Sequence, residues 1–368
     1  MSIKTIAILG AGHGGLAAAG DLSLRGFEIR LHARRQATLD PIIAKGGVKV
    51  QGVKRGFAPI SLLTTNVEEV LEGADLIMLV VPSVAHEYYA TALAPLLKPT
   101  TPIFINPGHS FGGLHFVHCL RKAGYSQPVK TCESVTLTYI CRKTDPAAVE
   151  IYSYVKNLKF SGFPGKHAPE LFKIISLIYP EIELRSSVLE TGMTNINAVF
   201  HSPGMLMNAG WIEATDGNFL FYRDGITQSV GKIIGEVDAE RLAITKALGI
   251  PSASFLENFY QAGLTTWEAM RSDNISRACI ESEPNKSIKA PTSLDHRYIH
   301  EDVGFGLVPF SALAKLADVS TPTIDSIIHL CSRAMGIDYY STGLTIEKMG
   351  LSNVQKTDLH RFVNEGSC

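Results

Sequence analysis

The sequence lacks any marked imbalance of charge and any hydrophobic run long enough to span a membrane. Lysine and arginine number 34 against 35 aspartate and glutamate, which gives a formal net charge of −1. A chain this close to neutrality has no general attraction for nucleic acid or for an anionic membrane, so we expect neither as a partner. The first predicted strand begins within a few residues of the start, which leaves no room for a signal peptide and predicts a cytoplasmic location.

Cysteine is also scarce. Six cysteines are scattered along the chain without a C-x-x-C pair. A metal site needs convergent ligands, so we expect no metal and interpret the thiols as structural. The hydrophobic content of 45% and charged content of 19% are typical of a globular protein. A length of 368 residues exceeds what one core usually organises, which predicts two domains.

A glycine-rich turn lies between the first predicted strand, Ile6–Leu9, and a helix predicted from about His13 to Arg25. Gly10, Gly12 and Gly15 follow G-x-G-x-x-G spacing. In such a turn the first glycine permits a tight bend, the second leaves room for a pyrophosphate, and the third allows close packing of the helix. Free amides at the helix N-terminus face the phosphates. We therefore predict a dinucleotide site whose loop contacts come from Gly10, Gly12, His13, Gly14 and Gly15.

The end of the second predicted strand lacks an acid. An NAD site usually has a carboxylate about 20 residues after the loop, where it binds the ribose hydroxyls. This chain has His32, Ala33, Arg34 and Arg35 instead. Two guanidinium groups suit a 2′-phosphate, so Arg34 and Arg35 predict NADP(H) in preference to NAD(H). The alternative is that both arginines are solvated loop charges.

Strands and helices continue to alternate, which predicts a doubly wound parallel sheet, the Rossmann fold. Asp75–Val81 and Pro102–Asn106 are the next predicted strands. Ligands of such sheets bind at the carboxyl ends of the strands, so we expect Val81, Pro82 and Asn106 to contact the cofactor. The alternative is that these residues only form turns at the strand ends and contact no cofactor. Residues 145–164 are predicted to extend the same sheet.

The composition changes near Ser186, after which helical periodicity replaces strand signals. We predict a NAD(P)-binding Rossmann domain over residues 1–185 and an all-helical substrate and catalytic domain over 186–368. The first helix of the second domain is predicted from about Leu189 to Ala209. Residues 272–292 are predicted to be a surface excursion, and the tail from 352 onward carries no clear signal.

Three polar residues of that first helix, Thr194, Asn197 and His201, are spaced by three and four and so share a predicted face. His201 is the candidate acid and base, because an imidazole titrates near cellular pH. Asp302 is the candidate for orienting it, and Arg297 offers a planar fork for a substrate carboxylate. Asp302 is predicted to lie just before a turn. A histidine that only packs and an arginine that is only solvated are the alternatives.

Taken in order, the motifs GAGHGG, VVP, NPG, TNINAVFH, RYIHEDVGFGLVP and LTIEKMGL resemble those of the octopine/nopaline (opine) dehydrogenase family over nearly the whole chain. The resemblance implies NAD(P)H-dependent reductive condensation of an amino acid or amine with a 2-oxo acid, through an imine, to a secondary-amine dicarboxylate. It also implies a helical domain like the C-terminal one of 6-phosphogluconate dehydrogenase.

By this resemblance His201 is the catalytic histidine, Asp302 its acidic partner, and Arg297 the residue that binds the substrate carboxylate, with Asn197 and Thr194 as further substrate contacts. A bacterial member of the family carries an acid at the end of the second strand, where this chain has Ala33 and Arg34. The cofactor preference therefore depends on the charge argument.

Two alternatives remain. Ketopantoate reductases share the architecture but use a helix lysine, and the segment 189–209 contains none. A catalytically silent NADPH-binding module would not need the histidine, the acid and the arginine. The identities of the amine and the 2-oxo acid are not readable from the sequence, and a homodimer is left open as the assembly.

Overall fold

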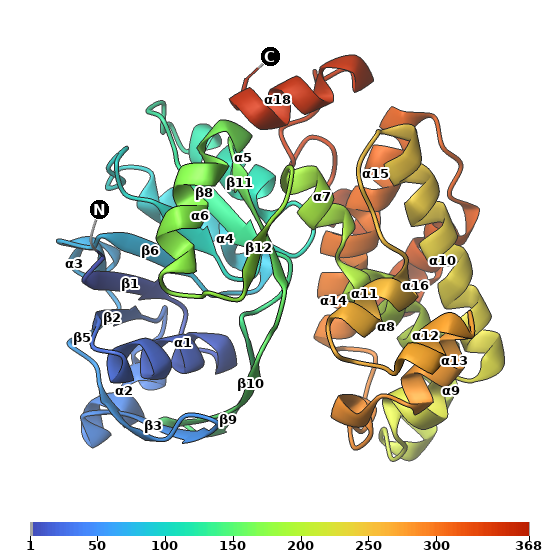
Figure 1. Ribbon diagram of the computed structural model, residues 1–368, viewed down its shortest axis with the longest axis horizontal. Helices are drawn as coiled ribbons and strands as arrows, with labels where there is room; N and C mark the ends of the chain where they lie inside the picture. The colour runs from blue at the N-terminus through green and yellow to red at the C-terminus, as the bar shows by residue number, and fades with distance from the viewer. Residues whose placement is uncertain (1–2, 368) are drawn as a thin grey trace. The chain divides into compact units, whose positions relative to one another are not determined.

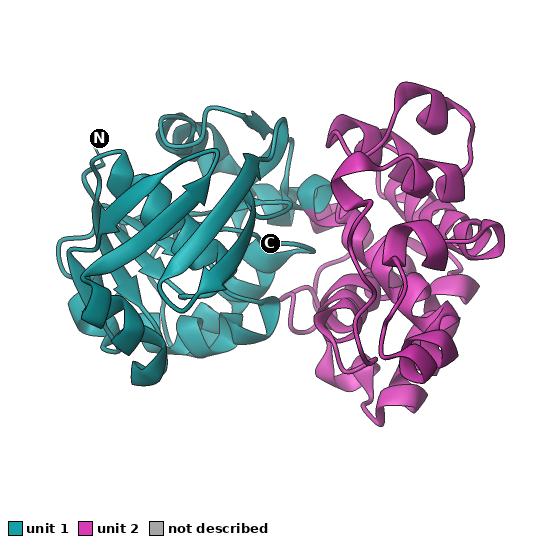
Figure 2. Ribbon diagram, turned by 90° about the horizontal axis from the view of Figure 1, so that it is seen from below, with its two compact units in different colours: residues 1–191, 360–368 teal, residues 192–359 magenta. Residues whose placement is uncertain are grey.

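The computed structural model describes residues 3–367. They form two compact units (Figure 2). Unit 1 contains the residues up to Thr191 together with the segment from His360 onward, and unit 2 contains Gly192–Leu359. The predicted division after residue 185 therefore differs from the structural one. Helix α7 (Val188–Met193) crosses the boundary, and its Thr191 hydroxyl hydrogen-bonds to Glu133 of unit 1 at 2.6 Å.

The main sheet of unit 1 has the order β12-β11-β8-β7-β6-β1-β2-β5 (Figure 1). The strands from β8 to β5 are mutually parallel, whereas β11 pairs antiparallel with β8 and β12 follows β11. The doubly wound sheet is thus confirmed for the strands that follow the glycine loop. The strands are β1 (Thr5–Leu9), β2 (Glu28–His32), β5 (Leu62–Thr64), β6 (Leu76–Leu79), β7 (Ile103–Ile105), β8 (Thr131–Ser134), β11 (Leu158–Phe163) and β12 (Ile182–Leu184).

A second, smaller sheet has the order β4-β3-β10-β9. It comprises β3 (Gly47–Gly52), β4 (Gly56–Pro59), β9 (Tyr139–Asp145) and β10 (Ala148–Tyr154). The prediction that residues 145–164 all extend the main sheet is therefore wrong for β10. The reason is tertiary: β10 pairs in parallel with β3, about a hundred residues earlier in the chain.

Helix α1 (His13–Leu24) lies against strands of both sheets. Residues 14–22 of this helix are buried without interruption. A helix covered on all sides needs small residues where backbones approach closely, and a Cβ on Gly20 would lie 2.5 Å from a methyl of Val50. The Ala/Gly-rich sequence of α1 is thus explained by its position between two sheets. The N-terminus of α1 is thereby fixed at the carboxyl end of β1.

The other helices of unit 1 flank the main sheet. They are α2 (Gln36–Lys45), α3 (Val67–Leu71), η1 (Ser83–Ala85), α4 (His86–Leu93), α5 (Gly112–Lys122), η2 (Gly165–His167), α6 (Ala168–Ser176) and α18 (Leu359–Glu365). Helix α18 lies in the tail for which the sequence gives no clear signal. Val363 is buried there and Phe362 packs on Phe163 with ring centroids 6.0 Å apart, which is why the tail belongs to unit 1.

Unit 2 is helical, as predicted. Its segments are α8 (Ile196–Met207), α9 (Ala209–Thr215), η3 (Phe221–Gly225), α10 (Gln228–Ala247), α11 (Phe255–Gln261), α12 (Trp267–Arg271), α13 (Ile275–Ile280), η4 (Glu283–Asn285), α14 (Arg297–Asp302), η5 (Val303–Leu307), α15 (Val308–Ala317), α16 (Pro322–Met335), α17 (Tyr339–Thr342) and η6 (Lys356–Asp358). In the part of the chain that the structure describes, no helix combines the length and apolarity needed to cross a membrane.

Three local predictions for unit 2 are corrected by the structure. The helix predicted over 189–209 is interrupted, because the Asn195 side chain accepts a hydrogen bond from the Asn197 amide and caps a new helix, α8. The surface excursion predicted over 272–292 contains α13, whose Ala278 and Cys279 are buried. The predicted turn near Gly304 is instead a π-helical segment, so α14, η5 and α15 follow one another without a break.

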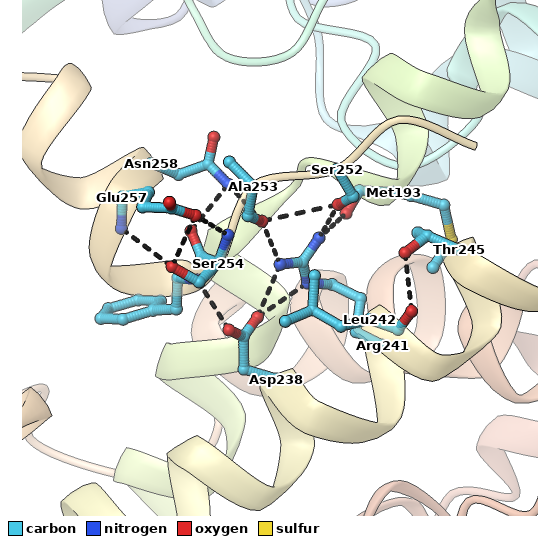
Figure 3. A network of polar contacts seen from close by, with 11 residues as sticks. Met193, Asp238, Arg241, Leu242, Thr245, Ser252, Ala253, Ser254, Glu257 and Asn258 are labelled. Carbon is cyan, nitrogen blue, oxygen red and sulfur yellow. Dashed lines mark hydrogen bonds and ion pairs between the residues drawn. The ribbon is translucent and has the colours of Figure 1, made fainter. Parts of the chain in front are cut away.

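A buried ion pair holds the middle of unit 2 together (Figure 3). Arg241 is fully buried, and its guanidinium donates to Asp238 at 2.7 and 2.9 Å and to the carbonyl oxygens of Met193 and Ala253. Asp238 also accepts the Phe255 amide at 2.7 Å. A buried charge with this many partners is structural, since each polar atom is compensated within the fold. It joins α10 to the start of α11 and to the end of α7.

Candidate active site and cofactor loop

The glycine loop of unit 1 has the backbone that its spacing predicts. Gly10 has φ +116°, and a Cβ there would lie 2.3 Å from the Val80 carbonyl oxygen. A Cβ on Gly15 would lie 1.8 Å from the Gly10 carbonyl oxygen. At both positions the protein itself requires glycine. A Cβ on Gly14 would also crowd the Leu137 methyls, at 2.7 Å.

Gly12 differs from these glycines. It is exposed, and a Cβ there would meet no described atom within 4 Å. It is also the N-cap of α1, so no side-chain oxygen caps the first amides of that helix. A helix N-terminus with open space in front of it suits an anion. The loop therefore fits a pyrophosphate, as the sequence predicts.

His13, the first residue of α1, is exposed but tied to the second sheet. Its Nδ1 accepts a hydrogen bond from the Lys143 amide at 2.8 Å. In the neutral ring this bond leaves the proton on Nε2. A contact between His13 and the cofactor stays a prediction, and only Nε2 has the proton to donate.

The end of β2 presents cations to solvent. Arg34 and Arg35 are both exposed, and the Arg34 guanidinium lies over the Tyr88 ring at 5.4 Å. His32 is buried between the Tyr89 hydroxyl and the Thr65 carbonyl, each 3.1 Å from a ring nitrogen. Burial lowers the pKa of His32, which keeps it neutral at cellular pH. The charge at this strand end thus comes from the arginines.

The three residues predicted at the next strand ends have different surroundings. A Cβ on Gly10 would lie 2.7 Å from a Val81 methyl, so Val81 lies beside the glycine loop, and Pro82 is exposed. Asn106 is fully buried, and its amide bonds to the Thr138 side chain at 2.9 Å and to the Thr138 amide and Ser134 hydroxyl at 3.1 and 3.2 Å. These bonds make Asn106 a residue that fixes the strand end, and a cofactor contact from it stays a prediction.

Two buried titratable groups of unit 1 gave no signal in the sequence. Glu133, at the end of β8, accepts the Gly113 amide at 2.7 Å, and its burial raises its pKa to about 7. His86, the first residue of α4, is fully buried, and neither ring nitrogen has a hydrogen-bond partner among the described residues. Burial and the neighbouring imidazoles of His115 and His109 lower the pKa of His86 well below its usual value.

In unit 2 the structure brings His201 and Asp302 together. Nδ1 of His201 on α8 donates to Oδ2 of Asp302 on α14 at 2.9 Å, although the residues are 101 positions apart. Both are buried, with 7% and 5% exposure. A carboxylate at Nδ1 fixes the tautomer, stabilises the protonated ring and makes Nε2 the nitrogen that exchanges protons with a partner.

A close helix contact makes this pairing possible. Gly306 of η5 lies against α8, where a Cβ on it would be only 2.4 Å from the Ala198 Cβ. The small residues at 198 and 306 let the two backbones approach, and Asp302 lies one turn before Gly306. The π-helical segment that replaces the predicted turn thus helps to set the His201–Asp302 distance.

Two aromatic residues complete the surroundings of His201, and the sequence did not identify either. Tyr298 on α14 stacks on the imidazole with ring centroids 3.7 Å apart and an interplanar angle of 10°. The Tyr222 hydroxyl, from η3, lies 3.1 Å from Nε2. Tyr298 lies within the RYIHED motif one turn before Asp302, which is a usable signal. Tyr222 has none, because no spacing links it to His201.

The other predicted substrate residues of unit 2 are placed less uniformly. Thr194 is buried before the start of α8, so it does not share a helical face with His201 as predicted, whereas Asn197 is partly exposed on the first turn of α8. Arg297 has a side chain 62% exposed and forms an ion pair at 2.7 Å with Glu301, which is itself buried. Only one of its terminal nitrogens makes this bond, so the Arg297 fork keeps donors for a carboxylate.

His296 is a further neighbour of the site that the sequence left out. It caps α14, with its Nδ1 accepting the Tyr298 amide, and its ring packs edge-on against Tyr298. Burial lowers the pKa of His296, and so do the nearby His201 and Arg297. Among residues 3–367, no group of three or more His, Cys, Asp or Glu side chains is arranged to hold a metal ion.

Comparison with known proteins places this geometry in a family. Residues 184–335 match the model of the NAD/NADP octopine/nopaline dehydrogenase alpha-helical domain, and residues 6–106 match that of ketopantoate reductase PanE/ApbA. The opine dehydrogenase of Arthrobacter sp. (strain 1C) is 33% identical over 365 residues, covering 98% of this chain and 99% of the relative. The tauropine dehydrogenase of Arabella iricolor is 25% identical over 77% of this chain and 76% of the relative.

Solved structures have the same fold. Octopine dehydrogenase with NADH and L-arginine superimposes with a TM-score of 0.79 at 19% identity, covering 97% of this chain and 98% of that one. Yersinopine dehydrogenase with NADP+ gives 0.74 at 14% identity, covering 99% and 98%. The chain therefore belongs to the octopine/nopaline dehydrogenase family of NAD(P)-dependent oxidoreductases.

Proposed function

We propose that this chain condenses an amino acid or amine with a 2-oxo acid and reduces the imine to a secondary-amine dicarboxylate, as an opine dehydrogenase that also runs in reverse. The observation that carries the proposal is the buried His201–Asp302 pair within the family's helical domain. A buried imidazole held by a carboxylate at one nitrogen is suited to delivering a proton from the other.

We assign the proton transfer to His201. In the reductive direction the amine nitrogen bonds to the carbonyl carbon, and its two protons pass to the carbonyl oxygen, one of them by way of His201 Nε2, so that water leaves and the C=N bond forms. His201 Nε2, protonated again from solvent, then gives a proton to the nitrogen as a hydride reaches the carbon, which yields the secondary amine. Asp302 holds Nδ1–H throughout and stabilises the imidazolium. Thr194 and Asn197 remain proposed substrate contacts at the start of α8.

Arg297 is the proposed clamp for a substrate carboxylate. Its ion pair with Glu301 fixes one side of the guanidinium, and the remaining N–H groups suit a bidentate carboxylate. An exposed arginine with a buried acid behind it is held in place without being fully neutralised. A carboxylate common to amino acids and 2-oxo acids is the ligand that such a fork fits best.

The cofactor supplies the hydride when it is bound. We propose that the Gly10–Gly15 loop binds its pyrophosphate and that Arg34 and Arg35 bind a 2′-phosphate, so that NADP(H) is preferred to NAD(H). Two adjacent exposed arginines follow β2, and residues 32–35 contain no acid, which supports this preference. Val81, Pro82 and Asn106 are proposed at the strand ends that face the cofactor.

The substrates of relatives narrow the first assays. Octopine dehydrogenase has been solved with L-arginine, with agmatine and with pyruvate. We propose an amino acid or amine of that size range as the nitrogen donor and pyruvate or another small 2-oxo acid as the acceptor. A cytoplasmic location, a homodimer and the absence of nucleic-acid and membrane partners stay predictions.

The decisive assay follows NADPH consumption over a matrix of amines and 2-oxo acids. We expect turnover only when both organic partners are present. His201→Ala should lower turnover by about two orders of magnitude, because general acid–base catalysis contributes that much or more. His329→Ala, an exposed histidine of unit 2, is the matched control and should leave turnover unchanged. Equal turnover in His201→Ala would remove His201 from the chemistry.

The ketopantoate-reductase alternative is tested in the same matrix. The match to that family covers residues 6–106, which lie within unit 1 and hold the cofactor loop. If 2-oxo acids alone consumed NADPH at full rate, the chain would be a 2-oxo acid reductase. If no pair of substrates consumed NADPH although NADPH bound, it would be a silent binding module.

A further inference from the structure

Tyr222 occupies a position beside His201 that no family motif in the sequence covers. It lies in the π-helical segment η3, and its ring stacks on Phe200 with centroids 4.9 Å apart and an interplanar angle of 18°. Its side chain is buried, and burial raises the Tyr222 pKa well above its usual value. At cellular pH the group is therefore a neutral hydroxyl, and the stacking on Phe200 fixes its ring.

The hydroxyl completes a clamp on the imidazole. Asp302 accepts from Nδ1 at 2.9 Å, the Tyr222 oxygen lies 3.1 Å from Nε2, and Tyr298 covers one face of the ring. Both nitrogens of His201 thus have partners within unit 2 before any substrate binds. A substrate atom that takes a proton from Nε2 must compete with the Tyr222 hydroxyl for that nitrogen.

A hydroxyl can pair with either state of the ring. It donates O–H to the lone pair of neutral Nε2, and it accepts Nε2–H from the imidazolium. The second bond is charge-assisted and so about twice as strong as the first. Tyr222 therefore favours the protonated ring at Nε2, the nitrogen that Asp302 does not contact, where the rings of Phe200, Phe221 and Tyr298 otherwise surround the imidazole.

We propose that Tyr222 is a positioning residue that orients His201 and holds its proton at Nε2 until the substrate takes it. The inference rests on the proposed role of His201. When Nε2–H passes its proton to the substrate heteroatom, the Tyr222 O–H, which also lies within hydrogen-bond reach of the Tyr298 side chain, turns to donate to the vacated lone pair. The other titratable groups near the imidazole and the Tyr222 hydroxyl are Asp302 and Tyr298 on α14, His296 at the N-cap of α14, and Cys279 on α13.

The test is Tyr222→Phe, which keeps the stacking on Phe200 and removes only the hydroxyl. We expect the NMR titration of the His201 ring, assigned by its loss in His201→Ala, to move to lower pH by about half a unit or more. In NADPH oxidation His201 must be protonated to donate, so the alkaline limb of kcat against pH should also move to lower pH, with the KM for NADPH unchanged. Tyr260→Phe, a tyrosine at the surface of unit 2, should change neither measurement.

Asp302→Asn removes the charged partner of Nδ1 and serves as the reference. It should move the His201 titration to lower pH by more than Tyr222→Phe does. An unchanged His201 titration in folded Tyr222→Phe, with Asp302→Asn shifted, would overturn the proposal. The NMR measurement needs no substrate, so it tests the role of Tyr222 separately from the proposed opine dehydrogenase activity. If no substrate pair supports turnover but the titration shifts, the proposed function fails while the hydroxyl still controls the ring.

Discussion

At the scale of single residues, we expect the proposed preference for NADP(H) to depend more on Arg34 than on Arg35. Arg34 lies over the Tyr88 ring, which limits the positions of its guanidinium. Arg35 is the N-cap residue of α2, and among the described residues no such ring contact holds its side chain. A cation held on an aromatic ring loses less side-chain entropy when it binds a phosphate.

Arg34→Ala should raise the KM for NADPH about tenfold or more, the value of one charge-assisted contact, and leave the KM for NADH nearly unchanged. Steady-state kinetics with both cofactors measures the ratio. Arg55→Ala, also an exposed arginine of unit 1, is the control. An equal rise in the KM for NADPH and in the KM for NADH would show that Arg34 does not bind the 2′-phosphate.

We expect His86 to make unit 1 sensitive to acid. Its pKa is lowered in the folded state, so the unfolded chain binds more protons as the pH falls through 6.5, the usual histidine value. Stability from a neutral His86 is present above about pH 6.5 and is lost below it. His86→Leu should therefore reduce the fall in Tm between pH 7.5 and pH 5.5, measured by calorimetry. His329→Leu, on an exposed helix position, should retain the wild-type fall.

At the scale of elements, the contact between α8 and η5 brings together His201 and Asp302, the proposed catalytic pair. Because a Cβ on Gly306 would lie 2.4 Å from the Ala198 Cβ, Gly306→Ala must move one helix against the other. We expect a loss of about 1–3 kcal/mol in the free energy of unfolding and a fall in kcat, since the His201–Asp302 bond spans the same contact.

Gly210→Ala is the matched control for this prediction. Gly210 is exposed on α9, and a Cβ there meets nothing within 4 Å. A glycine replaced by alanine in a helix should be neutral or stabilise by roughly 0.5–1 kcal/mol. Urea denaturation and NADPH oxidation measure both variants, and a fully active Gly306→Ala enzyme would contradict the proposed link.

At the scale of the whole molecule, unit 1 is built from both ends of the chain. Val363 of α18 is buried in unit 1, so Val363→Asp places a charge in an apolar site. We expect this variant to lower the melting temperature of unit 1, followed as the transition that bound cofactor should raise, because unit 1 contains the glycine loop proposed to bind it. Val53→Asp makes the same change at a valine 59% exposed in unit 1 and should leave that transition in place. If Val363→Asp and Val53→Asp changed the melting temperature of unit 1 equally, α18 would not stabilise unit 1.

Local chemistry explains what the sequence determined. The strand, glycine turn and helix at the start are specified by residues within a short stretch, since Gly10 and Gly15 are required by contacts with neighbouring backbone. The helical character of the second half follows from its periodicity in the same way. His201, Asp302 and Arg297 were identified by residue type and by family motif. The contact between His201 and Asp302 could not be derived from the sequence positions alone.

Only the tertiary structure decided which distant residues meet. Tyr222 reaches Nε2 of His201 through a π-helical segment, and β10 leaves the main sheet to pair with β3. The tail was polar in sequence, yet it folds onto unit 1 through Val363 and Phe362. Such contacts depend on packing between segments far apart in the chain, and local propensity and spacing carry no record of that packing.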